Sequence, residues 1–213
     1  DELGGIKEIL PRSRNDAHKL IEECMLLANV AAAEYALKNE MPMLYRVHEP
    51  PEFSRIQKVR DFVKLLGLNF PEQPTQKDYQ AVIEATKERI DAPSIHAVLL
   101  RSMMQAYYGA SNAGHYGLAY EAYTHFTSPI RRYPDLLLHR AIKAHLNNKP
   151  SPLSGGALDE AGDHFSATER RADEASRSVT TWLKCHYMQQ HLGEEFVGII
   201  SATAEFGLFV TLK

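Results

Sequence analysis

Apolar residues recur every three or four positions along most of this chain, and this spacing limits its fold more than any other feature. The first such segment begins near residues 13–16, where polar side chains can cap a helix, and continues to about Lys38. Five more helices are predicted from their start and stop signals. They cover residues 54–67, a segment that begins after 75, residues 93–109, residues 129 or 134 to 147, and residues 166–191. A mostly helical domain is therefore expected over residues 1–191.

A smaller part of the chain favours β-strands. Residues 43–47 form a short apolar stretch, and residues 115–123 alternate large and small side chains with the period of a strand. Two apolar runs, 196–200 and 208–212, flank a turn around Gly207. Two strands alone are marginally stable in water, so they indicate the start of a second, β-rich domain over 192–213. The predicted class is α+β.

The composition excludes several kinds of protein. The chain has two cysteines far apart, no histidine and cysteine spacing typical of a metal site, and no apolar run long enough to span a membrane. A leader for secretion is not evident, and a reducing cytoplasm fits best. The net charge of −3 and the pI of about 6.4 are unlike those of most nucleic-acid-binding domains. Any site for a polyanion must therefore be local.

One segment concentrates positive charge beside groups that bind anions. Thr127 and Ser128 precede Pro129 at a predicted helix start, where free N–H groups favour an anion. Arg131 and Arg132 follow, and guanidinium groups match phosphate oxygens. Nearby aromatic residues, Tyr116 among them, could stack on bases. The alternative is structural: Arg132 pairs with Asp135, and the tyrosines Tyr120 and Tyr123 belong to the core.

A second candidate site follows the first helix. His18, Glu22, Met25 and Asn29 lie on one line beside its apolar face, and a glutamate there could accept a hydrogen bond from a ribose hydroxyl. The alternative is a solvated face on which Lys19 and Glu23 form an ordinary ion pair.

Two further groups admit a functional or a structural interpretation. The mixed-sign run 169–177 is typical of an exposed helix surface. Phe206 and Phe209, beside Gly207, could stack on bases from the surface of a barrel, or at least one of them could belong to its core.

These motifs resemble the RNase II/RNase R family of exoribonucleases. Residues 15–29 and 115–142 are similar to two signature blocks of the family, and the Thr127–Arg131 block is highly specific. Residues 169–175 and 182–185 resemble the RNase R branch. Residues 193–213 are similar to the start of the RNA-binding OB fold that follows the catalytic RNB domain.

The resemblance implies a processive hydrolase that threads the 3′ end of single-stranded or structured RNA into a channel and releases nucleoside 5′-monophosphates. Arg131 would bind the scissile phosphate, and losing its charge should damage the transition state more than RNA binding. Glu22, or its neighbour Glu23, would select ribose. Mg²⁺ would activate water. The enzyme is expected to be monomeric and cytoplasmic, without membrane contact.

One departure from the family pattern is important. The metal-binding aspartates, spaced Asp-x-x-x-x-x-Asp-x-Asp-Asp, have no counterpart here, so no metal ligand is assigned. The chain is therefore expected to be a fragment, inactive alone, that holds phosphate- and ribose-binding residues. Two alternatives remain: a non-catalytic RNA-binding or regulatory protein with a degenerate RNB domain, and a helical scaffold without an RNA role.

Overall fold

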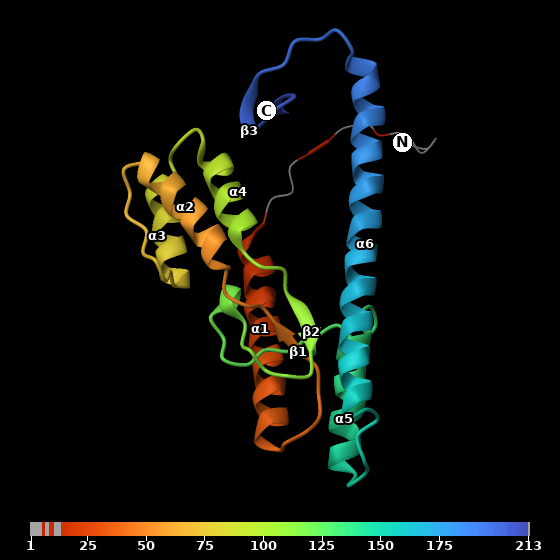
Figure 1. Ribbon diagram of the computed structural model, residues 1–213. Helices are drawn as coiled ribbons and strands as arrows, with labels where there is room; N and C mark the ends of the chain where they lie inside the picture. Colours follow the sequence, from red (N-terminus) through yellow and green to blue (C-terminus); the bar gives the residue numbers. More distant parts are fainter. Residues whose placement is uncertain (1–5, 7–8, 11–13, 213) are drawn as a thin grey trace. The chain divides into compact units, whose positions relative to one another are not determined.

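The computed structural model describes residue 6, residues 9–10 and residues 14–212 and divides them into two units (Figure 1). Unit 1 contains the described residues up to Val47, together with Tyr107–Gly114 and Glu121–Glu194. Unit 2 contains His48–Ala106, His115–Tyr120 and the described residues from Glu195 onward. The chain therefore passes between the units several times. Helices and two small sheets confirm the predicted α+β class.

Unit 1 is built on three helices and one two-stranded sheet: α1 (Asp16–Lys38), β1 (Tyr45–Val47), β2 (Tyr107–Gly109), α5 (Tyr133–Leu146) and α6 (Gly156–Met188), followed by the short 3₁₀ helix η2 (Gln189–His191). Helix α1 begins as predicted, because the Asn15 side chain accepts a hydrogen bond from the His18 N–H. The earliest start considered, Ser13, lies outside the described residues. Strand β1 pairs antiparallel with β2, Arg46 opposite Tyr108.

The core of unit 1 relies on small residues of α1. Ala32, Ala33 and Ala36 are buried and allow close approach of Leu138 and Ala141 from α5. Leu158 of α6 packs in a second cluster with Leu44, Tyr108 and Leu137. The C-terminal half of α6 is exposed, and so is most of the run 169–177 that was predicted to be surface. Glu169 is the exception, because it is half-buried and pairs with Arg46.

Unit 2 contains a three-helix core and a hairpin. The elements are α2 (Phe53–Leu65), α3 (Gln76–Thr86), α4 (Ala92–Ser102), the 3₁₀ helix η1 (Tyr116–Leu118), β3 (Gly198–Ala204) and β4 (Gly207–Leu212). Val59 and Val63 of α2 pack with Tyr79, Ile95 and Leu99. The helix predicted after 75 begins with a capping box of Thr75 and Asp78, and the hydrogen bonds from Thr75 lower the pKa of Asp78. The two strands of the hairpin are antiparallel, with a bulge between 200 and 202.

The strand predicted over residues 115–123 is wrong. The chain instead forms η1 and folds back on itself, so that His115 and Tyr120 exchange backbone hydrogen bonds. Ala119 adopts a left-handed conformation with φ of 58°. Gly117 does not relieve a strand: its N–H donates to His48 Nδ1 at 2.8 Å, and a Cβ there would lie 2.6 Å from that atom.

Two predicted helix boundaries are wrong, and a third matches one of the two starts considered. Helix α4 ends at Ser102, whose hydroxyl donates to the Leu99 carbonyl, and residues 107–109 form β2 instead. Helix α5 begins at Tyr133, the delayed start that Pro134 suggested. Helix α6 begins at Gly156, ten residues before the predicted capping box at Ser166. That serine bonds to Gly162 and Tyr108 instead.

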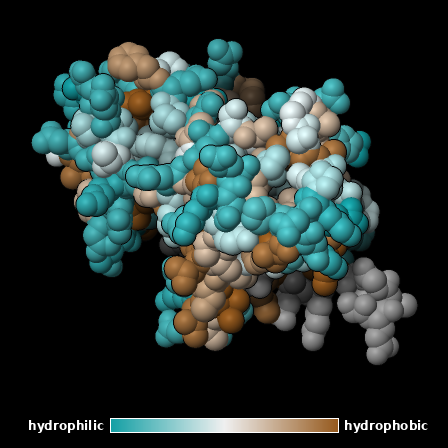
Figure 2. Space-filling view, turned by 90° about the horizontal axis from the view of Figure 1, so that it is seen from below, coloured by the Kyte–Doolittle hydropathy of each residue, from teal (hydrophilic) through white to brown (hydrophobic). Residues whose placement is uncertain are grey.

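The surface is mixed in character. On the face shown in Figure 2, hydrophilic residues predominate, and hydrophobic residues gather in several groups among them. Among the described residues, no helix combines the length and the apolar composition that crossing a membrane requires.

Candidate functional site

Residues 127–132, which we call the arginine turn, precede α5 in unit 1. The Ser128 N–H and Nη2 of Arg132 both donate to Oδ1 of Asp135, at 2.7 and 2.8 Å. The backbone N–H groups of Arg131 and Arg132 donate to the Ser128 carbonyl. Thr127 and Ser128 therefore lie in a turn ahead of the helix, and the N-cap is Arg132, contrary to the predicted position. The pairing of Arg132 with Asp135, offered as the structural alternative, is confirmed.

Asn29 supports the same turn from α1. Its Oδ1 accepts hydrogen bonds from the N–H groups of Phe126 and Thr127 at 2.9 and 3.2 Å, and its Nδ2 donates to the Tyr123 hydroxyl. The side chain is only 3% exposed. Two of the predicted site segments thus meet at Asn29, but this residue binds the backbone of the turn rather than facing solvent.

Arg131 differs from Arg132 in its exposure and in its partners. It is exposed, and within the described part of the chain its guanidinium group has no hydrogen-bond or ion-pair partner. It lines a pocket of about 400 Å³ formed by the start of α5 and by one side of α6. The pocket also contains Arg132, Tyr133, Phe165, Glu169 and Asp173. An unpaired guanidinium at the rim of such a pocket can bind a phosphate through two parallel hydrogen bonds.

A second ion pair forms one wall of this pocket. Nη1 of Arg46 lies 2.7 Å from Oε2 of Glu169, and the Arg46 guanidinium also lies 4.7 Å from the centre of the Tyr108 ring. The Tyr108 hydroxyl bonds to Nδ1 of His125, and burial raises the pKa of Tyr108 to about 12. Sequence reasoning missed Arg46 and Tyr108, because 123 residues separate Arg46 from Glu169 and no local pattern connects them.

Buried polar atoms without partners gather in this segment. Thr127 Oγ1, Arg132 Nε and Asp135 Oδ2 have no hydrogen-bond partner within the part of the chain that the structure describes. Each such atom costs stability, and native proteins contain few of them. Their concentration in nine consecutive residues is typical of a segment shaped for binding rather than for stability.

The exposed end of α1 carries the other residues of the predicted stripe. His18 bonds to Asn15 within the capping box, and Glu22 forms an ion pair with Arg14. Glu22 and Glu23 are both exposed. His18 and Asn29 are eleven positions apart in α1, which corresponds to about 16 Å along the helix axis. His18 therefore lies well away from the hydrogen bonds that Asn29 makes. Lys19 pairs with Asp16 and not with Glu23.

Three predicted aromatic contacts belong to unit 2. Tyr116 packs against the three-helix core, and its hydroxyl donates to the Pro74 carbonyl at 2.6 Å. Burial raises its pKa to about 12. Phe206 and Phe209 are 84% and 51% exposed, with ring centres 5.8 Å apart. Both rings are therefore exposed on this two-stranded hairpin, and whether either would belong to the core of a complete barrel stays a prediction.

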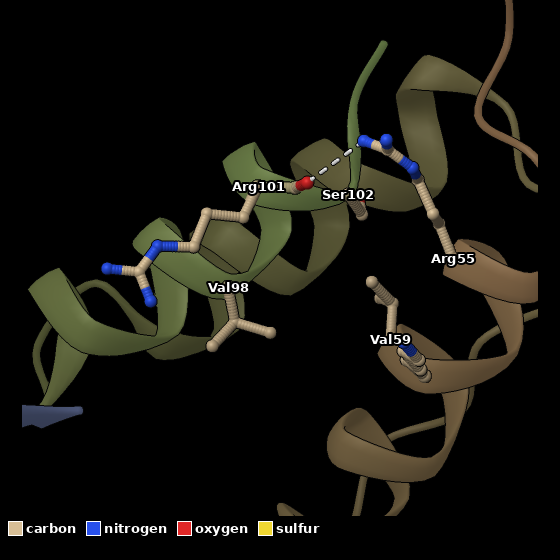
Figure 3. Close-up of a pocket in the computed structure, with 6 residues that line it drawn as sticks. Arg55, Val59, Val98, Arg101 and Ser102 are labelled. Atoms are coloured by element: carbon tan, nitrogen blue, oxygen red, sulfur yellow. Dashed lines mark hydrogen bonds between the residues drawn. The ribbon is translucent and has the colours of Figure 1, made fainter. Parts of the chain in front are cut away.

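Unit 2 also has a basic pocket that the sequence did not predict. It has a volume of about 450 Å³ and is lined by Arg55, Lys58 and Arg101 among others (Figure 3). Arg55 donates to the backbone carbonyls of Arg101 and Met103 at the end of α4. This contact satisfies carbonyls that a helix end leaves free, which is a structural role.

The described residues offer no ligand set for a divalent cation. Among them, no three His, Cys, Asp or Glu side chains lie close enough together to hold a metal ion. Of the two carboxylates in the pocket beside Arg131, that of Glu169 is already paired with Arg46.

Comparison with known proteins gives consistent results. A family model described as the RNB domain matches residues 1–148. Ribonuclease R of Vibrio cholerae is 50% identical over 97% of this chain and 27% of its own length. Ribonuclease R of Escherichia coli is 46% identical over the same shares. The chain therefore spans about a quarter of the length of these relatives.

A solved structure shares the fold over nearly the whole chain. The structure of Mycoplasma genitalium RNase R in complex with ribose methylated single-stranded RNA superimposes with a TM-score of 0.85 at 27% identity. The match covers 94% of this chain and 33% of that one. The fold described above is thus also that of a protein solved with RNA bound.

Proposed function

Since this chain belongs to the RNB domain family, we propose that it supplies the phosphate- and ribose-binding part of a processive 3′→5′ exoribonuclease. The substrate is single-stranded or structured RNA with a free 3′ end, and the products are nucleoside 5′-monophosphates. The relatives named above are ribonucleases R, which supports this substrate class. The last residues, 192–213, would begin the RNA-binding OB fold, and residues 1–191 would belong to the RNB domain.

The observation that carries the proposal is the way the arginine turn is held. Asn29 and Asp135 fix its backbone from two sides, while the guanidinium of Arg131 stays exposed and unpaired within the described chain. A rigid turn that presents one free cation beside a pocket is suited to binding a phosphate in a fixed orientation.

Arg131 has a specific role in the proposed reaction. Water attacks the terminal phosphodiester, negative charge grows on the non-bridging oxygens, and the guanidinium stabilises that charge more in the transition state than in the bound substrate. Because a guanidinium stays protonated, this role does not depend on pH in the ordinary range. Thr127, Ser128 and Arg132 shape the phosphate subsite.

Other residues contribute to the RNA site in this proposal. Glu22, or else Glu23, accepts a hydrogen bond from a ribose 2′-hydroxyl, with His18 beside it; both glutamates are exposed. Phe206 and Phe209 offer exposed rings on which bases stack. Tyr116 is a weaker candidate, because its hydroxyl and one face are already engaged.

Mg²⁺ belongs to the reaction of the whole protein in this proposal. No residue of this chain is assigned to the metal in this proposal, and no step is assigned to it here. We expect the 213-residue chain to release no nucleotides from labelled RNA in the presence of Mg²⁺. The two cysteines are free, which is compatible with the reducing cytoplasm that we propose as its location. A monomeric state is also proposed, with sedimentation as its test.

The first prediction tests phosphate binding by Arg131. Fluorescence anisotropy with a labelled RNA oligonucleotide should show about tenfold weaker binding for Arg131→Gln, because one charge-assisted hydrogen bond contributes about 1.5 kcal/mol or more. The plot of log affinity against log salt should also lose about 0.7 of its slope, the value for one phosphate contact on a single strand.

Lys143→Gln is the matched control, since it removes one positive charge from the exposed surface of α5, away from the pocket. Equal losses for Arg131→Gln and Lys143→Gln would mean that Arg131 acts only through net charge. If the unmutated 213-residue chain binds RNA no better than it binds neutral polymers, the proposed function itself is contradicted.

A further inference from the structure

Asp135 is a fully buried carboxylate at the start of α5, with none of its surface exposed. We propose that Asp135 is a positioning residue that orients Arg131 for phosphate binding and makes Arg132 an internal counter-ion. This inference rests on the proposed function, because it names the residue that determines how the arginine turn presents its cation.

One oxygen atom connects the two ends of the turn. Oδ1 of Asp135 accepts hydrogen bonds from the Ser128 N–H and from Nη2 of Arg132. Arg131 lies between these two donors in the sequence, and its own N–H donates to the Ser128 carbonyl at 3.2 Å. The position of the Arg131 backbone is therefore set from both sides, and the starting direction of its side chain follows from that position.

The same carboxylate distinguishes two adjacent arginines. Arg132 is 18% exposed and its guanidinium is neutralised by Asp135, whereas Arg131 is exposed and unpaired within the described residues. Without Asp135, both guanidinium groups would compete for one phosphate in variable geometry. With it, a single arginine meets the ligand. The sequence suggested the pairing of Arg132 with Asp135 only as one of two interpretations.

The chemistry of the site argues against a role in stability alone. A buried ion pair contributes little net stability, because desolvation of both ions offsets their attraction. Here Oδ2 of Asp135 and Nε of Arg132 are buried without partners in the described chain, so the pair is incompletely satisfied. Such an arrangement is a poor way to stabilise a fold and an effective way to specify one backbone conformation.

A double-mutant cycle on RNA affinity tests this inference with the 213-residue chain. Asp135→Asn keeps the shape of the side chain and removes its charge. It should weaken RNA binding about fivefold when Arg131 is present and less than about 1.5-fold when Arg131 is already glutamine, because coupled residues are not additive. A merely structural role for Asp135 would give the same loss in both backgrounds, and that outcome would overturn the inference.

Two further measurements keep the test informative. Amide hydrogen exchange of Ser128 and Arg131 should accelerate in Asp135→Asn, while the exchange of α5 residues 139–144 should not change. If Asp135→Asn does not fold, Asp135→Glu replaces it, because it keeps the charge and displaces the oxygen that accepts from Ser128 and Arg132. We expect Asp135→Glu to weaken RNA binding when Arg131 is present and to add little when Arg131 is already glutamine, and full additivity would contradict the positioning role.

The proposed function and the positioning role of Asp135 can fail separately. If the unmutated chain binds RNA no better than neutral polymers, the proposed function is wrong, and if Arg131→Gln leaves RNA affinity unchanged, only the phosphate contact of Arg131 in the bound complex is wrong. If Arg131→Gln weakens binding but the effect of Asp135→Asn adds to it in full, only the positioning role of Asp135 is wrong.

Discussion

Several buried polar side chains of unit 1 bind the backbone of a neighbouring segment. Thr124 donates to the Leu44 carbonyl at 2.7 Å, and the Ser166 hydroxyl accepts from the Tyr108 N–H at 2.8 Å. Asn29 binds the two N–H groups ahead of Ser128 in the same way. Because a buried backbone group without a partner costs about 1–3 kcal/mol, each of these side chains determines where its segment can lie. Single polar residues thus fix the backbone of segments that lead to the arginine turn and to Tyr108.

Tyr108 provides a prediction at this scale. Its pKa is raised to about 12 by burial, so the folded state holds this proton more tightly than the unfolded state, where a tyrosine hydroxyl has its usual pKa of 10.0. The contribution of this proton to the free energy of unfolding is fully present below pH 10. It is lost as the pH rises from 10 towards 12, and it amounts to at most about 3 kcal/mol. Tyr108→Phe should remove this part of the loss of stability at alkaline pH.

Urea unfolding between pH 8 and 12 measures the effect. At pH 8, Tyr108→Phe should be less stable by about 1 kcal/mol, because the hydrogen bond to His125 is gone. Tyr35→Phe is the control, a tyrosine on the exposed side of α1. If the stability of Tyr108→Phe falls between pH 10 and 12 as steeply as that of the parent chain, the buried hydroxyl is not the group that titrates.

At the scale of elements, the contact between α6 and β2 depends on a glycine. A Cβ on Gly162 would lie 2.7 Å from the Tyr108 carbonyl oxygen and 3.2 Å from a Leu44 methyl group. Four residues later on the same face, Ser166 bonds to the Tyr108 N–H. The helix can therefore approach the strand closely only because position 162 has no side chain.

Gly162→Ala should destabilise the chain by about 1–3 kcal/mol through overpacking, although alanine favours a helix more than glycine does. Gly156→Ala is the matched control in the same helix, since a Cβ there meets nothing within 4 Å. It should change the free energy of unfolding by less than about 0.5 kcal/mol. Urea unfolding of both variants gives the comparison, and similar values for the two would show that the close approach is not needed.

Elements set by local chemistry were predictable from the sequence. The Asn15 cap, the Thr75 capping box and the delay of α5 to Pro134 all follow from residues within one helical turn. The strand at 115–123 and the start of α6 were wrong because distant partners decide them: His48 binds Gly117, and Tyr108 binds Ser166. Local periodicity contains no information about such partners.

The candidate site shows the same division. Arg131 and its turn were found from residue types and family resemblance, and both remain predictions until RNA binding is measured. The pairing of Asp135 with Arg132 was foreseen, but the burial of Asp135 and the contacts of Asn29 and Arg46 were not, because they depend on side-chain contacts between segments far apart in the sequence or on packing. A residue pattern indicates chemistry, whereas the geometry that orients it comes from the fold.

At the scale of the whole molecule, each of the two units has a core of its own. In unit 1 the core surrounds Val47, and in unit 2 it surrounds Val63; both valines are fully buried. The chain enters and leaves each unit more than once. Segments that are neighbours in sequence, such as 106 and 107, therefore belong to different cores, which no linear division of the sequence would predict.

Separate cores lead to a prediction about local stability. Val63→Ala should cost about 2 kcal/mol and accelerate amide exchange mainly in α2, α3 and α4. Val47→Ala, a matched change at an equally buried valine, should accelerate exchange mainly in α1, β1 and α5. Hydrogen exchange followed by mass spectrometry resolves the two patterns. Equal acceleration in both units for both variants would mean that the chain unfolds as one cooperative body.

The hydrogen bonds from Asn29 to the arginine turn also determine when the turn can form. They join residues 97 and 98 positions apart in the chain, so the intervening segment must be closed into a loop before either bond exists. Loop closure over such a separation is slow and entropically costly, unlike the formation of α1 itself. During folding the turn is therefore ordered late, and a nascent chain exposes Arg131 on a mobile segment until α1 has docked.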